Sequence, residues 1–287
     1  MSDAAEDVFW AAHFVLMTVL SRVSFYWVYD LPNWLFGVLT VALTIAIGLG
    51  GLYTTRKWVL RLHGERHSHN EVVGFYLGAV CVFYGITLGL VVVATWQNYS
   101  GVDTRVGEEA AAVGALYRDV GSFPDPNRTE LQADLRQYVL EVINVAWPQQ
   151  RRGIVPQEEG VTLSKFQTHL AEFEPATDRQ KSIYAETYRG FNMVAELRGR
   201  RLQAVRTGLP GPIWSVVLIG ALLTIALTWF FDMRSQSMHF WMTVMLSALL
   251  GLLIYLLAAL DNPFRGQISV VPAPFQLMYS RRILGGE

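Results

Sequence analysis

The sequence predicts an all-α integral membrane protein with four transmembrane helices and a helical soluble domain inserted between the second and the third of them. Hydrophobic residues make up 52% of the 287 residues, charged residues make up 16%, and the mean hydropathy is positive, which is outside the range of ordinary soluble proteins. Four apolar segments are long enough to cross the roughly 30 Å hydrocarbon core of a bilayer. Tryptophans mark the ends of these segments, as expected for rings that prefer the headgroup region.

Composition also excludes several classes of protein. The formal net charge is −1, and the sequence shows no cluster of lysine and arginine interleaved with aromatic residues, so we expect no nucleic-acid partner. The single cysteine, Cys81, lies inside an apolar segment and cannot form an intrachain disulfide. No serine–histidine–aspartate set or glycine-rich phosphate loop is recognisable. We therefore expect neither enzymatic activity nor a cofactor.

Residues 1–33 form the first predicted segment and allow two interpretations. Val8 to Tyr29 is apolar but contains His13 and Arg22, and its polar residues are spread around the helix. The segment is either an interfacial helix or a fifth transmembrane span. The acidic N-terminus has no small-residue cleavage site after the apolar part, which argues against a cleaved signal peptide.

Residues 34–97 are predicted to form a hairpin of two spans, Trp34 to Tyr53 and Val72 to Trp96. The second span runs for 25 residues without a charge. Its glycines fall within about 60° of one another around a helix axis; they are Gly74, Gly78, Gly85 and Gly89. Such a stripe of glycines allows another helix backbone to approach closely.

Residues 98–210 are predicted to form the helical soluble domain. The helix of the second span continues past Trp96 to about Tyr117, and prolines then break it. Capping boxes predict two further helix starts; they pair Asn127 with Glu130 and Thr177 with Gln180. We expect the first of these helices to end at Pro148 and the second to end near Arg206.

Residues 211–260 are predicted to form a second hairpin, with spans Ile213 to Phe231 and Phe240 to Leu260, and residues 261–287 form a C-terminal tail. No Asp, Glu, Lys or Arg lies inside any of the four spans. Ion-coupled transporters and voltage sensors depend on such residues. The spans therefore favour passive conduction or no transport at all.

Charge predicts one orientation in the membrane, and the polar residues allow few chemical sites. The short loop between the first two spans is basic, so the positive-inside rule places it in the cytoplasm and the soluble domain outside.

His63 and His67 are four residues apart on one helix face and are weak candidates for a metal site. The alternative is a basic loop that faces the lipid headgroups. Glu108 and Glu109 are either a solvated face or partners of nearby arginines.

Two passages carry a resemblance to a known family. The second span opens with Gly74-Phe75-Tyr76, and Asp261-Asn262-Pro263-Phe264 follows the fourth span directly. Together with the order of two spans, a helical domain and two spans, they resemble bestrophin anion channels, which carry Gly-Phe-Tyr on the pore helix and Asn-Pro-Phe after the last span. More closely, residues 30–282 are similar to the bacterial bestrophin-like domain family.

The resemblance implies a homo-oligomer, with a pentamer favoured, whose second span surrounds a central pore in the inner membrane. The partners would be the lipid bilayer, other copies of the chain and inorganic ions. It also implies a cytoplasmic helical domain, opposite to the charge argument, so the side stays open. The family's constriction corresponds to Phe75; Glu71 and His67 stand at the earlier constriction positions, and a ring of carboxylates there favours cations. The acidic run of calcium-activated members is missing, so calcium gating is not implied.

Helix geometry separates two candidate pore faces on the second span. Phe75 lies about 100° from Gly74 and shares its side with Ala79, Val82 and Ile86. We expect this apolar side to line the pore and the glycines to pack against a neighbouring helix, with the reverse arrangement as the alternative. The function hypothesis is an oligomeric ion channel. Its rivals are a non-conducting membrane scaffold or sensor whose helical domain binds a partner, and a metal-dependent membrane enzyme that uses His63 and His67.

Overall fold

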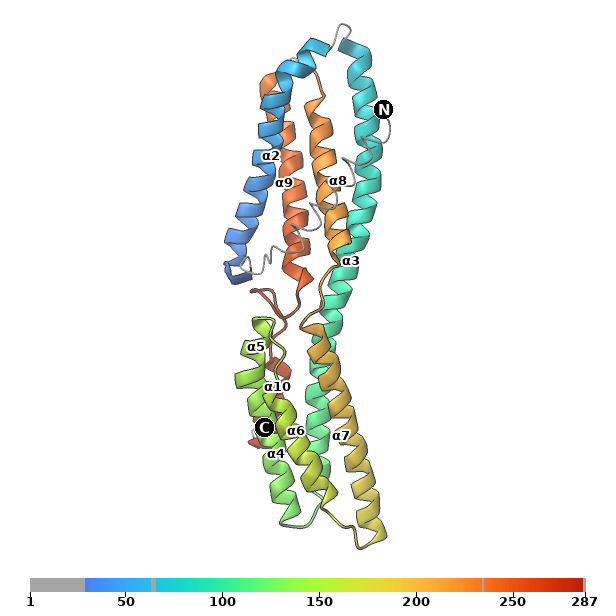
Figure 1. Cartoon of the computed structure of the whole chain (residues 1–287), viewed down its shortest axis with the longest axis vertical. Coiled ribbons are helices and arrows are strands. Elements are labelled where there is room, and N and C mark those ends of the chain that lie inside the picture. Colours follow the sequence, from blue (N-terminus) through green and yellow to red (C-terminus); the bar gives the residue numbers. More distant parts are fainter. Residues whose placement is uncertain (1–28, 63–65, 234, 286–287) are drawn as a thin grey trace, which may run out of the picture. The chain divides into compact units, whose positions relative to one another are not determined.

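The computed structural model describes residues 29–62, 66–233 and 235–285, and every regular element within these ranges is helical (Figure 1). The predicted segment at residues 8–29 lies almost wholly outside the described residues. The chain divides into two units. The first, which we call the span unit, comprises Met1–Trp96 and Gly208–Asp261; the second, the bundle unit, comprises Gln97–Thr207 and Asn262–Glu287.

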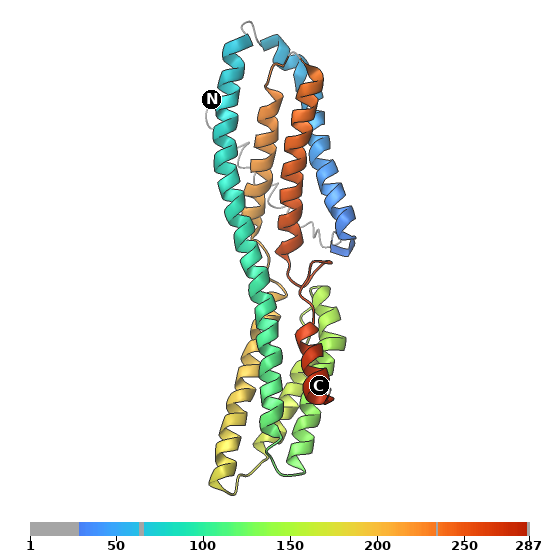
Figure 2. The ribbon, with the colours of Figure 1, turned by 180° about the vertical axis from the view of Figure 1, so that it is seen from behind.

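The span unit contains four helices that are long and apolar enough to cross a membrane. They are α2 (Asn33–Leu62), the first part of α3 (Arg66–Val120), α8 (Gly211–Trp229) and α9 (Gln236–Asp261). Figures 1 and 2 show α2, α8 and α9 side by side from opposite directions. The prediction of an all-helical chain with four candidate spans is confirmed.

Small residues bring α2 and α9 together. A Cβ on Gly251 would lie 2.4 Å from the hydroxyl of Thr44, and one on Gly48 would lie 2.3 Å from the hydroxyl of Ser247. At Gly251 the backbone of α2 is also close, since the added Cβ would lie 2.9 Å from the Cα of Val41, so α9 needs glycine there. A different contact joins α3 to α8, since the ring of Tyr84 occupies the space beside Gly220.

The bundle unit is a group of helices around one apolar core. It consists of the second part of α3, α4 (Asn127–Glu141), the π-helix η2 (Val142–Ala146), α5 (Trp147–Arg151), α6 (Glu158–Ala171), α7 (Asp178–Ala204), α10 (Ala273–Met278) and the π-helix η3 (Tyr279–Ile283). The sequence analysis predicted that the helix of the second span continues past Trp96, and this is confirmed, because α3 runs from the apolar span to Val120. Leu116, Tyr138 and Phe166 are almost fully buried and join α3, α4 and α6 in the core.

The starts and ends of the bundle helices were predicted in part. The capping box at Thr177 forms, with Gln180 N donating to Thr177 Oγ1 at 3.2 Å. The box at Asn127 is wrong: the N-cap is Pro126 and carries no side-chain cap bond. Instead, the Thr129 hydroxyl donates to Asp125 Oδ1 at 2.8 Å.

Pro148 does not end its helix, and α6 was missed. The π-turn of η2 changes the hydrogen-bond register just before Pro148, so helical structure continues to Arg151 past a residue that has no N–H to donate. The helix ends at Arg151, with Arg152 as the C-cap, and Gly153 follows it with a φ of 74° that suits glycine. The sequence analysis assigned no helix to residues 158–171, where Phe166 and Leu170 are buried in the core.

Candidate functional site

The span part of α3 presents a continuous apolar face that the other described residues leave largely uncovered. The exposed fractions are 76% for Phe75, 58% for Val82, 60% for Ile86 and 53% for Val93, while Ala79 is half-buried. Only 11% of the apolar window of α3 is buried, against 22%, 28% and 39% for the windows of the other described spans. Of the described spans, α3 is therefore the least covered by its own chain.

The opposite side of α3 makes the contacts within the chain. Val73, Tyr84, Leu88 and Thr95 are buried there, and they lie roughly 180° around the helix from Phe75. Tyr84 donates its hydroxyl to the carbonyl oxygen of Val217 in α8 at 2.9 Å, within a buried apolar cluster. Helix α3 is thus attached to the rest of the span unit by the side that faces away from Phe75.

The glycine stripe lies between these two faces and is open. A Cβ added to Gly78, Gly85 or Gly89 would meet nothing within 4 Å, and one on Gly74 would meet only the ring of Phe231, at 3.9 Å. The described part of the chain supplies no helix that packs on the stripe. The predicted seam thus has no partner in the described part of its own chain, and its role as a helix-packing surface stays a prediction.

Glu71 lies one helical turn before Phe75 and is exposed. His63 and the side chain of His67 lie outside the described residues. His69, their neighbour, donates from Nε2 to the carbonyl oxygen of Phe230 at 2.8 Å. Among the described residues, no group of three or more His, Cys, Asp and Glu side chains could hold a metal ion.

The segment Asp261 to Phe264 makes structural contacts in both units. In the span unit, the carboxylate of Asp261 accepts hydrogen bonds from Leu209 N at 2.5 Å and from Trp214 Nε1 at 3.3 Å. It thereby ties the end of α9 to the start of α8. In the bundle unit, Pro263 O accepts from Val270 N at 2.8 Å and closes a short loop that follows Asn262.

Phe264 anchors this loop in the core of the bundle unit. Its ring is 1% exposed and meets the ring of Trp147 edge-on, with centroids 5.6 Å apart. Trp147 Nε1 donates to the carbonyl oxygen of Val270, and its ring also contacts Phe275. Residues 261–287, for which the sequence analysis assigned no structure, therefore supply part of the bundle core.

A network of buried charges, not found as a unit from the sequence, joins four helices of the bundle unit. Glu109 of α3, Glu159 of α6 and Arg201 of α7 are all fully buried. Arg201 Nε donates to Glu109 Oε2 at 2.7 Å, and Arg201 Nη2 donates to the two oxygens of Glu159 at 2.9 and 3.0 Å. Tyr138 of α4 donates to Glu109 Oε1 at 2.7 Å, and Arg198 donates to Glu159 at 3.1 Å.

Burial and charge shift the pKa values of this network in a consistent direction. Burial, reinforced by the negative charge of Glu109, raises the pKa of Tyr138 well above its usual value. Burial also raises the pKa of Glu159, although Arg201 and Arg198 oppose the shift. For Arg201, burial alone would lower the pKa, but Glu109 and Glu159 outweigh it and raise the pKa further. The arginine therefore keeps its charge in the core.

The sequence analysis had singled out one member of this network, Glu109, without naming its partners. It offered a solvated face or arginine partners for Glu108 and Glu109. The structure separates the two residues, because Glu108 is exposed whereas Glu109 is buried against Arg201. A clue was present: Val102, Val106, Ala110 and Val113 place the buried side of α3 next to Glu109.

Comparisons with known proteins agree with this architecture. A sequence profile described as a Bestrophin-like domain matches residues 42–275. No curated protein matches at a significant level. Among solved structures, the chain is similar to a bacterial bestrophin homologue from Klebsiella pneumoniae, with 15% identity over 87% of this chain and 99% of that chain and a TM-score of 0.61. A variant of a bacterial bestrophin homologue from that organism has 14% identity over 86% of this chain and 99% of that chain, with a TM-score of 0.63. A variant of a membrane protein has 15% identity over 86% of this chain and 97% of that chain, with a TM-score of 0.64. At this identity, the similarity to solved structures shows a shared fold.

Proposed function

Since the chain belongs to the bestrophin-like domain family, we propose that it assembles into an oligomeric ion channel of the inner membrane, with α3 lining the pore. The observation that carries the proposal is the pair of opposite faces on α3. One face attaches the helix to α8 through Tyr84, and the other exposes Phe75, Val82 and Ile86. A helix that lines a central pore needs one face packed on its own subunit and an opposite face turned towards the pore axis.

The proposed assembly uses the glycine stripe as the seam between copies, with a pentamer as the favoured count. The stripe lies about 100° around the helix from the buried face and about 70° from the Phe75 face. A neighbouring α3 can therefore approach at Gly78, Gly85 and Gly89, where no side chain from the described part of the chain lies within 4 Å of an added Cβ. Lipid would cover the remaining apolar surface of the span unit.

The chemistry of the proposed pore is a charged entrance followed by an apolar constriction. Glu71 would repeat in each copy and form a ring of carboxylates, which attracts cations and repels anions. Phe75, one turn further, would form an apolar ring that conducts only when it is wetted. The interiors of the four predicted spans contain no Asp, Glu, Lys or Arg, the charged residues on which ion-coupled transport depends.

Reconstitution of the purified oligomer into liposomes tests the proposal directly. We expect passive ion flux that follows the electrochemical gradient, and a lower ratio of cation to anion permeability in Glu71→Gln. A stable oligomer that shows no flux over a range of pH and voltage would contradict the channel and favour the non-conducting scaffold.

A matched pair of phenylalanines tests the pore face. Phe75→Ala should raise the leak because the substitution widens the proposed constriction. Phe83→Ala is the control, since Phe83 is 73% exposed on the same helix but lies about 80° further around it. Equal fluxes in the two variants would remove Phe75 from the pore.

A second pair tests the seam. Gly85→Leu should reduce the oligomer to smaller species, measured by light scattering after size exclusion, because leucine would fill the stripe at a position where an added Cβ meets no described atom within 4 Å. Gly50→Leu on α2 is the control, since a Cβ there also meets nothing within 4 Å. An intact oligomer in Gly85→Leu would contradict the seam.

A further inference from the structure

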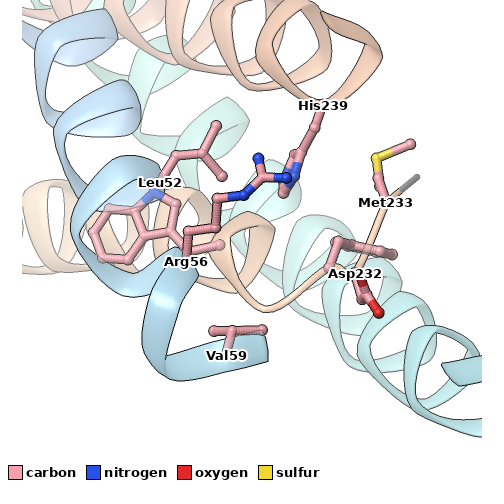
Figure 3. Close-up of a pocket in the computed structure, with 8 residues that line it drawn as sticks. Leu52, Arg56, Val59, Asp232, Met233 and His239 are labelled. Atoms are coloured by element: carbon pink, nitrogen blue, oxygen red, sulfur yellow. The ribbon is translucent and has the colours of Figure 1, made fainter. Parts of the chain in front are cut away.

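A small, partly open pocket lies in the span unit where α2 ends and α8 passes into α9 (Figure 3). Its apolar wall consists of Leu52, Val59, Trp229, Phe231 and Met233, and its polar groups come from Arg56, Asp232 and His239. Figure 3 shows the guanidinium of Arg56 pointing towards His239, while the carboxylate of Asp232 points away from it. The pocket thus combines an apolar wall with a single guanidinium.

Hydrogen bonds to backbone carbonyls fix the pocket wall. Trp229 Nε1 donates to the carbonyl oxygen of Gly48 at 2.9 Å. Its ring lies against Gly51, where a Cβ would be 2.0 Å from the nearest ring atom. On the other side, His239 Nε2 donates to the carbonyl oxygen of Thr228 at 2.9 Å. The indole and the imidazole are therefore held in place before any ligand binds.

The loop between α8 and α9 is held as firmly by the start of α3. Besides the hydrogen bond from His69 to Phe230, Asn70 Nδ2 donates to the carbonyl oxygen of Asp232 at 2.8 Å. The backbone N–H of Asp232 donates in return to Asn70 Oδ1 at 2.9 Å. The ring of Trp58 meets the ring of Phe230 edge-on, at 6.2 Å between centroids. Phe230 and Asp232, on this side of the pocket, are thus held in place.

Arg56 is the polar group that the pocket leaves without a partner. It is half-buried, and its guanidinium makes no hydrogen bond or ion pair with the described part of the chain. A guanidinium held against an apolar wall loses hydration that it cannot recover from its own chain. Its planar set of N–H donors matches the oxygens of a phosphate group.

We propose that the open side of this pocket binds the phosphate of an anionic membrane phospholipid, with Arg56 as the donor and the surrounding apolar side chains against the lipid's glycerol and first methylene groups. The position of the pocket favours a lipid over soluble phosphate. The apolar window of α2 ends at Val59 and α8 ends at Trp229. Trp58 and Trp241, both more than half exposed nearby, are the rings expected at headgroup level.

Binding of defined lipids to the purified, delipidated protein tests this site without any measurement of ion flux, so its outcome is independent of the proposed channel. Native mass spectrometry should show that phosphatidylglycerol is retained in preference to phosphatidylcholine, whose trimethylammonium group would bring a second cation to the pocket. Arg56→Gln should weaken the retention of phosphatidylglycerol about tenfold, and Arg56→Lys should keep part of it as a point charge.

Lys57 supplies the matched control because it is the next residue, carries the same charge, is exposed and does not line the pocket. Lys57→Gln should leave phosphatidylglycerol binding unchanged. Equal loss in Arg56→Gln and Lys57→Gln, or equal retention of the two lipids by the wild-type protein, would overturn the site. Displacement of the lipid by inorganic phosphate at comparable concentration would assign the pocket to a soluble anion and overturn the lipid proposal. The wild-type comparison of lipids stands even if an Arg56 variant fails to fold.

Discussion

One continuous helix, α3, is packed in opposite ways in its two parts. In the span unit its largest apolar side chains, such as Phe75 and Phe83, are exposed. In the bundle unit Val106, Val113 and Leu116 are completely buried. The first part thus leaves apolar surface for lipid or another copy, while the second part forms the core of its own chain.

The two units are also stabilised by different interactions. In the span unit, glycines allow close contact, and side chains such as Tyr84 and Trp229 donate to backbone carbonyls. This is expected where lipid removes the hydrophobic drive for helices to associate. In the bundle unit, aromatic packing surrounds a buried ion network centred on Arg201. The comparison predicts that charge substitutions act on one unit and small steric changes act on the other.

Removing the central charge of the network should have the largest effect. Arg201→Met leaves Glu109 and Glu159 buried with only Tyr138 and Arg198 as partners. We expect the free energy of unfolding to fall by about 3 kcal/mol or more. Denaturant unfolding of the full chain in detergent, followed by circular dichroism, measures this change.

The neighbouring arginine is the control for that experiment. Arg200 is more than half exposed and pairs with Glu196 on the same helix, so Arg200→Met should cost less than about 1 kcal/mol. If the two variants unfold alike, the network does not stabilise the bundle unit in the way that its burial implies.

The hydroxyl of Tyr138 should give the next largest effect, together with a pH dependence. Tyr138→Phe removes a hydrogen bond to the carboxylate of Glu109 and should cost about 1.5–3 kcal/mol at pH 8. Burial raises the pKa of Tyr138 in the folded state. Above a pH of about 10, the unfolded chain therefore loses this proton while the folded chain keeps it, and the wild type loses stability.

The variant lacks this titration, so the stability gap between the two proteins should narrow by about 1.4 kcal/mol per pH unit above pH 10. All other tyrosines are common to both proteins and cancel in the difference. Unfolding measured at pH 8, 10 and 11 tests this behaviour, and a gap that stays constant would mean that Tyr138 titrates normally in the folded protein.

Sequence reasoning recovers the elements of this fold that depend on local composition. Spans are recognised because a bilayer requires long uncharged segments, and α3 was predicted as one helix because no proline or glycine pair interrupts it before Pro124. Helix α6 was missed although Leu163, Phe166 and Leu170 recur at helical spacing in its sequence. Pro148 was misread since the π-turn before it is a tertiary adjustment.

For the candidate site, the sequence predicts which residues share a face of α3 but not which neighbour each face contacts. Helical periodicity places Phe75, Val82 and Ile86 together, and the structure leaves that face exposed. Periodicity does not say which face meets α8, because this depends on where Tyr84 and Gly220 come together. The link from Glu109 to Arg201 spans 92 residues, a distance in sequence over which no local pattern carries information.

Steric change in the span unit should have a smaller effect than loss of the buried charge. A Cβ at Gly51 would lie 2.0–2.5 Å from atoms of the Trp229 ring, so Gly51→Ala should cost about 1–3 kcal/mol through overpacking. Gly50 is the adjacent control, since its Cβ would meet nothing within 4 Å. Gly50→Ala should be neutral or stabilise the helix by up to about 1 kcal/mol. Thermal unfolding in detergent separates them, and equal behaviour would mean that the indole moves freely.

The smallest effect should come from the two capping boxes, which look equivalent in sequence and differ in structure. Thr177→Ala removes the hydroxyl that accepts from Gln180 N at the start of α7, and it should destabilise the bundle unit by about 1 kcal/mol. Asn127→Ala should change the stability by less than about 0.5 kcal/mol, because Asn127 is not the N-cap of α4 and its side chain caps nothing. Side-by-side denaturant unfolding of the two variants decides between them. A loss at Asn127 equal to that at Thr177 would show that α4 begins with the predicted box, and the Asp125 contacts to Arg128 and Thr129 would then not be what starts that helix.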